Sequence, residues 1–216
     1  MTDPVMQEVS PETSKGIDTR SDRSLFLYTI AAVGLALFVR FFIAAPYLVA
    51  GPSMEPTFQN HDYLIVDRLS YGLCLPSIPL IDIEVPCVPV SDPQRGDVVI
   101  FTLPQNRSET LIKRVIGLPG DTVKVAGTSV VITNAEYPDG FTLSEPYVDP
   151  QDMGGATGMM ITLPDDHYFV LGDNRKVSYD SRLWGTLPRA NIVGRVFLRL
   201  YPLDTLEILP GVTRYQ

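Results

Sequence analysis

The chain has 216 residues, of which 45% are hydrophobic and 19% charged, a composition typical of a folded protein. Its formal net charge of -8 argues against a nucleic-acid partner, because neutralising phosphates requires clustered Lys and Arg side chains. With two His and two Cys, an all-cysteine zinc site is impossible, and we expect no metal and no cofactor.

The N-terminal part of the chain divides into a polar and an apolar segment. Residues 1–23 are polar and acidic without apolar periodicity, so we expect a disordered cytoplasmic tail. Leu25 to Val39 is uncharged, and after Arg40 the chain stays apolar to Ala45. About 21 residues at roughly 1.5 Å each span roughly 31 Å, which predicts one transmembrane helix over residues 24–45.

The flanking residues of this span predict which side of the membrane the rest of the chain occupies. A removable signal peptide is an alternative, because Leu48-Val49-Ala50 loosely resembles a cleavage site. The long acidic leading segment favours an uncleaved anchor instead. Lys15, Arg20 and Arg23 precede the span, so the positive-inside rule places the N-terminus in the cytoplasm. Residues 46–216 are then expected to lie on the outer face of a phospholipid bilayer.

The two cysteines bracket a proline-rich insertion at about residues 73–93. Cys74 and Cys87 could form a disulfide, because an exported location permits one. Closing a loop of about 14 residues would contribute on the order of 3 kcal/mol. A pair of reactive thiols is the alternative.

Residues 46–216 read as a mainly β domain, an irregular antiparallel sheet with a barrel-like form. Short runs rich in Val, Ile, Tyr and Phe alternate with Gly, Pro and Asp turns, and no βαβ rhythm is present. Residues 134–164 indicate an inserted hairpin or loop region. The predicted strands are Tyr63–Leu69, Asp97–Thr102, Leu111–Ile116, Thr122–Val125, Val130–Thr133, His167–Leu171 and Ile192–Leu200.

Ser53 and Lys113 are the candidate chemical residues. The turn Gly51-Pro52-Ser53 restricts the backbone and could expose the serine hydroxyl just beyond the anchor. Lys113 interrupts an apolar strand, and if it points inward, desolvation lowers its pKa. Keeping an ordinary lysine neutral near pH 7.4 costs about 4 kcal/mol, so burial would have to remove much of that cost. A solvated lysine beside Arg114 is the alternative.

A third segment, residues 172–185, is dense in hydrogen-bonding side chains. It follows an apolar strand and ends near Trp184, the only tryptophan of the chain. This pattern indicates a polar network, although a surface loop would have a similar composition.

These segments, in this order, resemble bacterial type I signal peptidase, a membrane-bound serine endopeptidase with a Ser-Lys dyad. The motifs that carry the resemblance are SMEPTF, RGDVVIF, IKRVIGLPGD and GDNRxxSxDSRxWG, together with Tyr63-Leu64-Ile65-Val66. The resemblance covers roughly residues 40–125 and 167–195. It implies removal of signal peptides from exported preproteins after Ala-x-Ala-like sites.

The resemblance also implies a role for individual residues. Ser53 would be the nucleophile and Lys113 the general base. Ser178 would orient Lys113, and Asp180 and Arg182 would form a supporting ion pair. Supporting structure would come from Asp173, Asn174 and Arg175. The candidates for lining the pockets that accept an extended substrate are Tyr47, Val49, Leu111 and Ile112.

One position departs from the pattern of many family members. They carry a serine two residues before the nucleophile to stabilise the oxyanion, whereas this chain has Gly51. The Ser53 N–H would be one donor, and since loss of a donor costs about 2.7 to 4 kcal/mol, a second donor is needed. Its identity is open, as is the oligomeric state.

Three other functions fit parts of the sequence. A Ser-His-Asp hydrolase would need His61 or His167 as its base. A self-cleaving repressor would use similar Ser-Lys chemistry, but the apolar segment and the acidic charge speak against it. A catalytically silent, membrane-tethered module that captures extended peptides is the third alternative.

Overall fold

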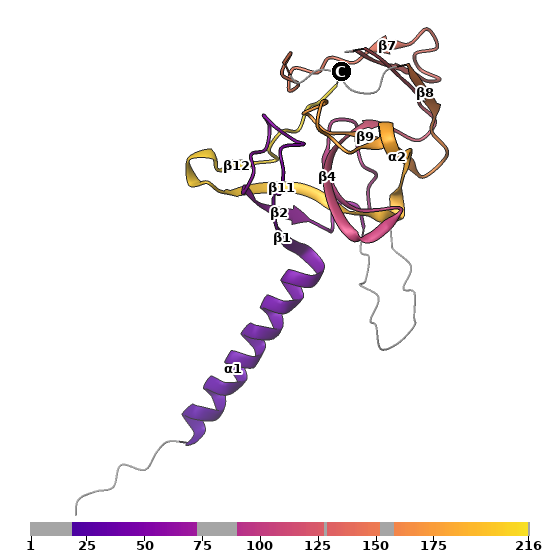
Figure 1. Cartoon of the computed structure of the whole chain (residues 1–216). Coiled ribbons are helices and arrows are strands. Elements are labelled where there is room, and N and C mark those ends of the chain that lie inside the picture. Colours follow the sequence, from indigo (N-terminus) through magenta and orange to yellow (C-terminus); the bar gives the residue numbers. More distant parts are fainter. Residues whose placement is uncertain (1–18, 73–89, 128, 152–157, 216) are drawn as a thin grey trace, which may run out of the picture. The chain divides into compact units, whose positions relative to one another are not determined.

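The computed structural model describes residues 19–72, 90–127, 129–151 and 158–215 (Figure 1). The chain forms two compact units that divide between Phe38 and Val39. Cys74 and Cys87, the predicted disulfide partners, lie outside the described residues.

Helix α1 (Thr19–Phe38) forms the first unit, and the second begins with a π-helical turn, η1 (Val39–Ile43). Strand β1 (Ala44–Leu48) follows directly. Helical structure therefore begins before the expected residue 24, and Ala44 and Ala45 belong to a strand and not to the helix. Within the described chain, no helix combines the length and the apolar character needed to cross a membrane.

The second unit, hereafter the β domain, is built on a large antiparallel sheet, as the sequence predicted. Its strands occur in the order β1, β2, β11, β3, β4, β9 and β10, and β12 pairs with β11. The strands after β1 are β2 (Tyr63–Asp67), β3 (Val98–Leu103), β4 (Asn106–Gly117), β9 (His167–Leu171), β10 (Leu187–Pro188), β11 (Ile192–Tyr201) and β12 (Glu207–Ile208).

A smaller antiparallel sheet joins it, in the order β7, β6, β5 and β8. Two of its strands come from the predicted insertion at residues 134–164, which therefore contributes sheet edges as well as loop. The strands are β5 (Thr122–Ala126), β6 (Ser129–Thr133), β7 (Phe141–Thr142) and β8 (Met159–Thr162). All seven predicted strands are present, with their ends shifted by a few residues at most sites.

Alternating burial explains why these segments form strands. In β5 and β6, every second side chain is buried, with Val123, Val125, Val130 and Ile132 in one cluster. Phe169 and Leu171 of β9 join the same cluster, so the small sheet shares its core with the large one.

A second cluster lies under the turn that follows β1. Met54 and Phe58 of this turn are fully buried against Leu64, Val66 and other apolar side chains of the large sheet. The short helices of the domain are α2 (Ser181–Trp184), η2 (Arg189–Asn191) and η3 (Leu203–Thr205). The buried turn and strand β4 are the two elements that position the candidate site.

Candidate active site

Ser53 and Lys113, which are 60 residues apart in the chain, are in direct contact. Lys113 Nζ lies 2.8 Å from Ser53 Oγ and 2.8 Å from the carbonyl oxygen of Ile112. Lys113 comes from β4, where it pairs with Val99 of β3, and Ser53 comes from the turn after β1. A neutral lysine at this distance can accept the serine proton, which is the arrangement that activates a hydroxyl nucleophile.

The surroundings of Lys113 favour the neutral amine. The side chain points into the protein and the residue is only 2% exposed, so the alternative of a solvated strand lysine is wrong. Burial lowers the pKa of Lys113 to about 8, although the carboxylates of Asp180 and Asp173 oppose the shift. A substantial fraction of the amine is therefore neutral near pH 8.

The turn that carries Ser53 is held in place by buried apolar side chains and by a backbone hydrogen bond from a neighbouring loop. Met54 and Phe58 are buried beneath it, and the Phe58 N–H donates to the Met54 carbonyl at 2.9 Å. On the side, the Asn174 N–H donates to the Ser53 carbonyl at 3.2 Å. Gly172 permits this close approach, because a Cβ there would lie 2.5 Å from Ser53 O and 2.2 Å from Ser178 Oγ.

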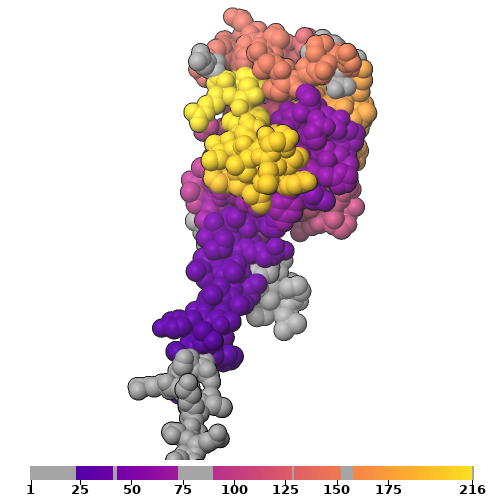
Figure 2. Space-filling view, turned by 90° about the vertical axis from the view of Figure 1, so that its left-hand side faces the viewer, coloured from indigo at the N-terminus to yellow at the C-terminus, as the bar shows by residue number. Residues whose placement is uncertain are grey.

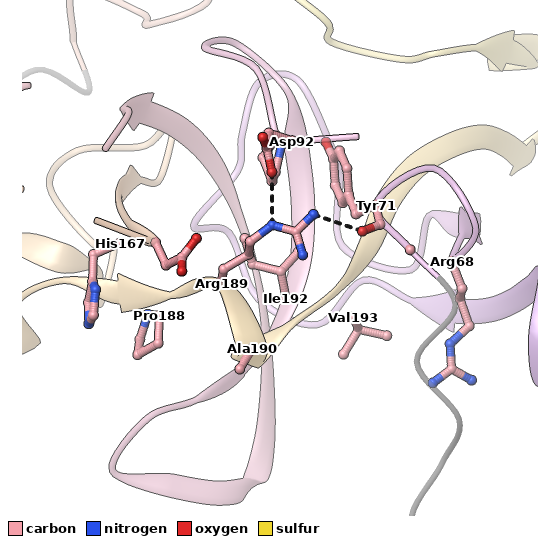
Figure 3. A pocket seen from close by; sticks show the side chains of 12 residues that line it. Arg68, Tyr71, Asp92, His167, Pro188, Arg189, Ala190, Ile192 and Val193 are labelled. Carbon is pink, nitrogen blue, oxygen red and sulfur yellow. Dashed lines mark hydrogen bonds and ion pairs between the residues drawn. The ribbon is translucent and has the colours of Figure 1, made fainter. Parts of the chain in front are cut away.

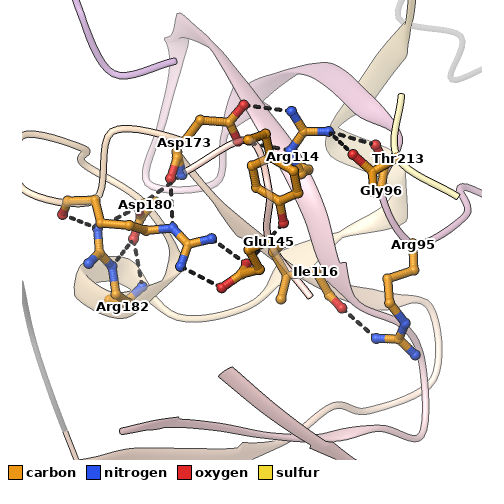
Figure 4. A network of polar contacts seen from close by, with 12 residues as sticks. Arg95, Gly96, Arg114, Ile116, Glu145, Asp173, Asp180, Arg182 and Thr213 are labelled. Atoms are coloured by element: carbon orange, nitrogen blue, oxygen red, sulfur yellow. Dashed lines mark hydrogen bonds and ion pairs between the residues drawn. The ribbon is translucent and has the colours of Figure 1, made fainter. Parts of the chain in front are cut away.

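A buried ion pair connects the strand of Lys113 with the turn of Ser53. Arg114 donates from Nε to one oxygen of Asp173 at 2.8 Å and from Nη2 to the other at 2.5 Å. Their side chains are 0% and 1% exposed. The Thr57 hydroxyl also donates to Asp173, at 2.5 Å. Figure 4 shows the contact between Arg114 and Asp173. Asp173 therefore links the neighbour of the lysine to the turn that holds the serine.

Electrostatics keep Arg114 charged. Burial alone lowers the pKa of Arg114, but hydrogen bonds and attraction from Asp173 raise it above its ordinary value. Bidentate pairing of this kind is among the stronger charge-assisted contacts.

Asp180 and Arg182 form a second bidentate pair, with Arg182 Nε and Nη2 each 2.8 Å from an oxygen of Asp180. Asp180 caps α2 by accepting from the Arg182 N–H and also accepts from the Gly172 N–H at 3.1 Å. Ser178 is buried beside Gly172, yet its hydroxyl has no hydrogen-bond partner among the described residues. The ion pair thus supports the loop, while the Ser178 hydroxyl stays available.

A cavity of about 200 Å³ contains both Ser53 and Lys113. All four predicted pocket residues line it, namely Tyr47, Val49, Leu111 and Ile112. The sequence did not single out the others, which are Leu48, Ala50, Leu64, Ile100 and Thr110. The cavity therefore runs between the end of β1 and the middle of β4.

A larger cavity, of about 600 Å³, lies elsewhere and contains neither Ser53 nor Lys113 (Figure 3). Arg189 in its wall donates to Asp92 at 3.0 Å and to the Tyr71 carbonyl at 2.9 Å, which makes it a tie between chain segments. Size alone is a poor guide here, because the polar groups that could perform chemistry converge in the smaller cavity.

Neither histidine lies in the cavity that contains Ser53, so neither is placed to act as its base. His167 lines the larger cavity, and its Nδ1 lies 2.9 Å from the Asp165 carbonyl oxygen. His61 lies outside the cavity of Ser53, with its backbone N–H donating to Val49. In the part of the chain that the structure describes, no group of three or more His, Cys, Asp or Glu side chains could hold a metal ion.

Gly51, which stands where many family members have a serine, contributes through its backbone conformation and its N–H group. Its φ of +91° favours glycine, and its N–H donates to Asn60 Oδ1 at 3.0 Å. The Ser53 N–H donates to no other described residue. Of these two N–H groups, the one on Ser53 is the one free to meet a developing oxyanion.

Sequence reasoning missed the partners that come from distant segments. Thr57, Glu145 and Tyr147 all contact the polar network around Arg114 and Arg175. The one available signal was Arg114 itself, because a second cation in an apolar strand requires a buried partner.

Comparison with known proteins gives a consistent result. A family model described as "Signal peptidase, peptidase S26" matches residues 23–201. A probable signal peptidase I-2 of Synechocystis is 37% identical, over 83% of this chain and 73% of the relative. A signal peptidase I of Leptolyngbya laminosa is 38% identical, over 81% and 77%. A signal peptidase I of Pseudomonas aeruginosa is 32% identical, over 83% and 73%.

The two acidic partners Asp173 and Asp92 provide a matched test of the buried ion pair. Asp173→Asn leaves the guanidinium of Arg114 buried without its counter-charge, and we expect a loss of about 3 to 5 kcal/mol in the free energy of unfolding. Asp92→Asn removes the partner of Arg189, but the Asp92 side chain is 78% exposed, and we expect a loss of about 0 to 1 kcal/mol. Urea unfolding at pH 7 measures both, and equal losses would contradict the assigned role of Asp173.

Proposed function

Because the chain belongs to the signal peptidase family, peptidase S26, we propose that it performs the family's reaction with Ser53 as nucleophile and Lys113 as general base. The enzyme is a signal peptidase I, which removes signal peptides from preproteins by hydrolysis of a peptide bond. The observation that carries the residue assignment is the 2.8 Å separation of Ser53 Oγ and Lys113 Nζ.

In the proposed first step, neutral Lys113 accepts the proton of the Ser53 hydroxyl while Oγ attacks the carbonyl carbon of the scissile bond. A tetrahedral intermediate forms with a negative oxygen. Lys113 then gives its proton to the leaving nitrogen, so the C–N bond breaks and the mature protein departs with a free amine. The signal peptide is left as an ester on Ser53.

The second step restores the enzyme with water. Lys113, again neutral, takes a proton from a water molecule that attacks the ester carbonyl. When the second tetrahedral intermediate collapses, the proton returns to Ser53 Oγ and the signal peptide is released as a carboxylic acid, which loses its remaining proton to water. One base therefore acts in both halves of the reaction.

The proposed oxyanion donor is the Ser53 backbone N–H, since the Gly51 N–H is engaged by Asn60. We propose that Ser178, whose buried hydroxyl has no partner among the described residues, orients the Lys113 ammonium when it forms. Asp180 and Arg182 would act on Lys113 indirectly, because they fix the loop that carries Ser178.

The substrate is proposed to bind as an extended strand along the cavity between β1 and β4. β1 is the terminal strand in the order of the large sheet, so one of its edges is unpaired among the described strands and can accept backbone hydrogen bonds. The apolar lining and the small volume, about 200 Å³, favour small side chains such as those of Ala-x-Ala. Preproteins that end their signal peptides in this way are the proposed partners.

We also propose that residues 24–43 anchor the enzyme in the bacterial plasma membrane, with the N-terminus cytoplasmic and the β domain outside. Large apolar side chains of α1 are exposed, for example Leu25 at 68% and Leu35 at 65%. Exposed apolar side chains in such a run are unfavourable in water and favourable in lipid. The basic residues Arg20 and Arg23 precede the run.

Substitution of the two central residues tests the assignment. Ser53→Ala removes the nucleophile, and Lys113→Arg replaces the base with a group that stays charged, so we expect both to lower kcat to background. Cleavage of a purified preprotein into mature protein and signal peptide is the measurement. His61→Gln and His167→Gln serve as controls and should cleave at close to the wild-type rate. Full activity in Lys113→Arg would exclude lysine as the base.

The pH dependence follows from the lowered pKa of Lys113. The active form carries the neutral amine, so activity is lost as pH falls below that pKa and is fully present above it. With a pKa of about 8, kcat/KM should rise through about pH 8 and level off above it. Initial rates on a short peptide substrate from pH 6 to about 10 give the profile. A rate that is flat across pH 8, with chemistry limiting, would rule out this base.

The membrane proposal is tested by alkaline carbonate extraction of cell membranes. The wild-type enzyme should stay in the membrane pellet. Leu35→Arg combined with Leu37→Arg places two charges in the apolar run, at roughly 2.5 to 3.5 kcal/mol each, and should release the enzyme to the supernatant. Release of the wild-type enzyme under the same conditions would contradict the anchor.

A further inference from the structure

The last described residues of the chain, 209–215, run along the polar network behind the active site and are called the strap below. Figure 2 shows the C-terminal residues, in yellow, at the surface against violet residues from the early part of the β domain. The strap starts where the Leu209 N–H donates to the Phe197 carbonyl at 2.7 Å. The strap therefore follows β12 directly in the chain, and its first residue is hydrogen-bonded to β11.

The strap supplies acceptors for the buried Arg114. Asp173 takes the donors on Nε and Nη2 of the guanidinium, which leaves Nη1 to be satisfied. Nη1 donates to the carbonyls of Gly96, at 3.1 Å, and of Gly211 in the strap. Figure 4 shows Arg114 between Asp173 on one side and Gly96 and Thr213 on the other. Without the strap, a donor of a buried cation would lose a partner.

An aromatic side chain covers the flat face of the same guanidinium. The ring centroid of Tyr147 lies 3.7 Å from Cζ of Arg114, a distance at which cation–π attraction is effective. The Tyr147 hydroxyl lies 2.8 Å from the hydroxyl of Tyr215 in the strap and 2.9 Å from Glu145. Glu145 in turn forms a buried ion pair with Arg175 of the loop beside Ser53. The segment from 145 to 147 and the strap thus close around one cation.

The strap and the domain approach each other closely at two glycines, while a cavity of about 320 Å³ lies beside Leu209 and residues 212–215. A Cβ on Gly96 would lie 1.8 Å from the Thr213 carbonyl oxygen. A Cβ on Gly211 would lie 2.5 Å from Thr57 Cγ2, and Thr57 is the residue that donates to Asp173. The Thr213 carbonyl is a backbone group that cannot rotate away, and the Thr57 side chain is held by its hydrogen bond to Asp173, so these two contacts keep the strap close to the turn of Ser53.

We propose that the strap and Tyr147 are positioning elements for peptide-bond cleavage, which hold Arg114 on Asp173 and thereby hold Ser53 in register with Lys113. The family model matches residues 23–201, so the strap lies beyond the matched residues. This inference rests on the proposed Ser53–Lys113 mechanism. Neither element contacts the cavity that contains Ser53, so both act through Arg114.

The test is a steady-state comparison of full-length enzyme with a variant that ends at Pro210. Cleavage of a peptide with an Ala-x-Ala site is the reaction followed. We expect kcat to fall about tenfold or more while KM changes by less than about threefold, because a misplaced nucleophile slows chemistry more than binding. Arg214→Ala is the control in the strap, since Arg214 is exposed, and it should leave both constants unchanged.

A second pair of variants keeps the chain at full length. Tyr147→Phe retains the ring over Arg114 and loses the hydroxyl contacts, whereas Tyr147→Leu loses the ring as well. We expect Tyr147→Leu to lower kcat several-fold more than Tyr147→Phe does. If the shortened variant does not fold, this pair decides the question, and wild-type kcat values for both Tyr147→Phe and Tyr147→Leu would overturn the proposal.

The pH profile separates positioning from a general loss of stability. The charged groups around Lys113 are the carboxylates of Asp173 and Asp180 and the guanidiniums of Arg114, Arg175 and Arg182, which pair with acidic groups. When Arg114 is held less firmly, Asp173 is less neutralised and favours protonated Lys113 more. The rise of kcat/KM should therefore move to higher pH in the shortened variant.

The outcomes distinguish the two levels of the proposal. A folded variant ending at Pro210 with wild-type kcat and an unshifted pH profile would overturn the positioning role while the dyad stands. A wild-type enzyme that fails to cleave, or a Ser53→Ala variant that still cleaves, would overturn the proposed mechanism itself. Cooperative thermal unfolding of each variant establishes that the folded enzyme is compared.

Discussion

The bidentate contact between Arg114 and Asp173 is the interaction on which the arrangement of the site depends. Lys113 and Ser53 lie on elements that are remote in sequence, so something must fix one relative to the other. Asp173 does this because it accepts from the neighbour of the lysine and from Thr57 in the turn of the serine. A buried charge is stable only with its partners in place, so the pair tolerates little displacement.

Burial serves the chemistry as well as the geometry. A lysine in water is almost entirely protonated at neutral pH, whereas desolvation of Lys113 brings its pKa to about 8. In the same low-polarity surroundings, each carboxylate near Lys113 has a strong effect on the pKa of the lysine. Pairing Asp173 with Arg114 and Asp180 with Arg182 keeps two negative charges near Lys113 from restoring its ordinary basicity. The ion pairs and the depressed pKa are thus parts of one electrostatic arrangement.

The sequence predicted the strands well because strands depend on local patterns, whereas the four cavity residues named from it came from the resemblance to a known family. Alternating burial identifies strands such as Thr122–Ala126, but the windows around Ser53 and Lys113 were each ambiguous alone, and only the ordered set of motifs pointed to the pair. The end of the N-terminal helix was harder to predict, because the apolar residues 44–45 are compatible with either a helix or a strand. Glu145 and Tyr147 could not be predicted, because their partners are 30 and more residues away and only the fold brings them together.

The protein holds Lys113 against Ser53 with its pKa lowered to about 8, so that a substantial fraction of the amine is neutral when it acts as the base. The most direct measurement is an NMR titration of the Lys113 side chain in the intact enzyme with 13C-labelled lysine. We expect a midpoint at about pH 8, well below the ordinary value of 10.5. A midpoint near 10.5 in the folded enzyme would contradict it, because the amine would then be charged when it has to accept the serine proton.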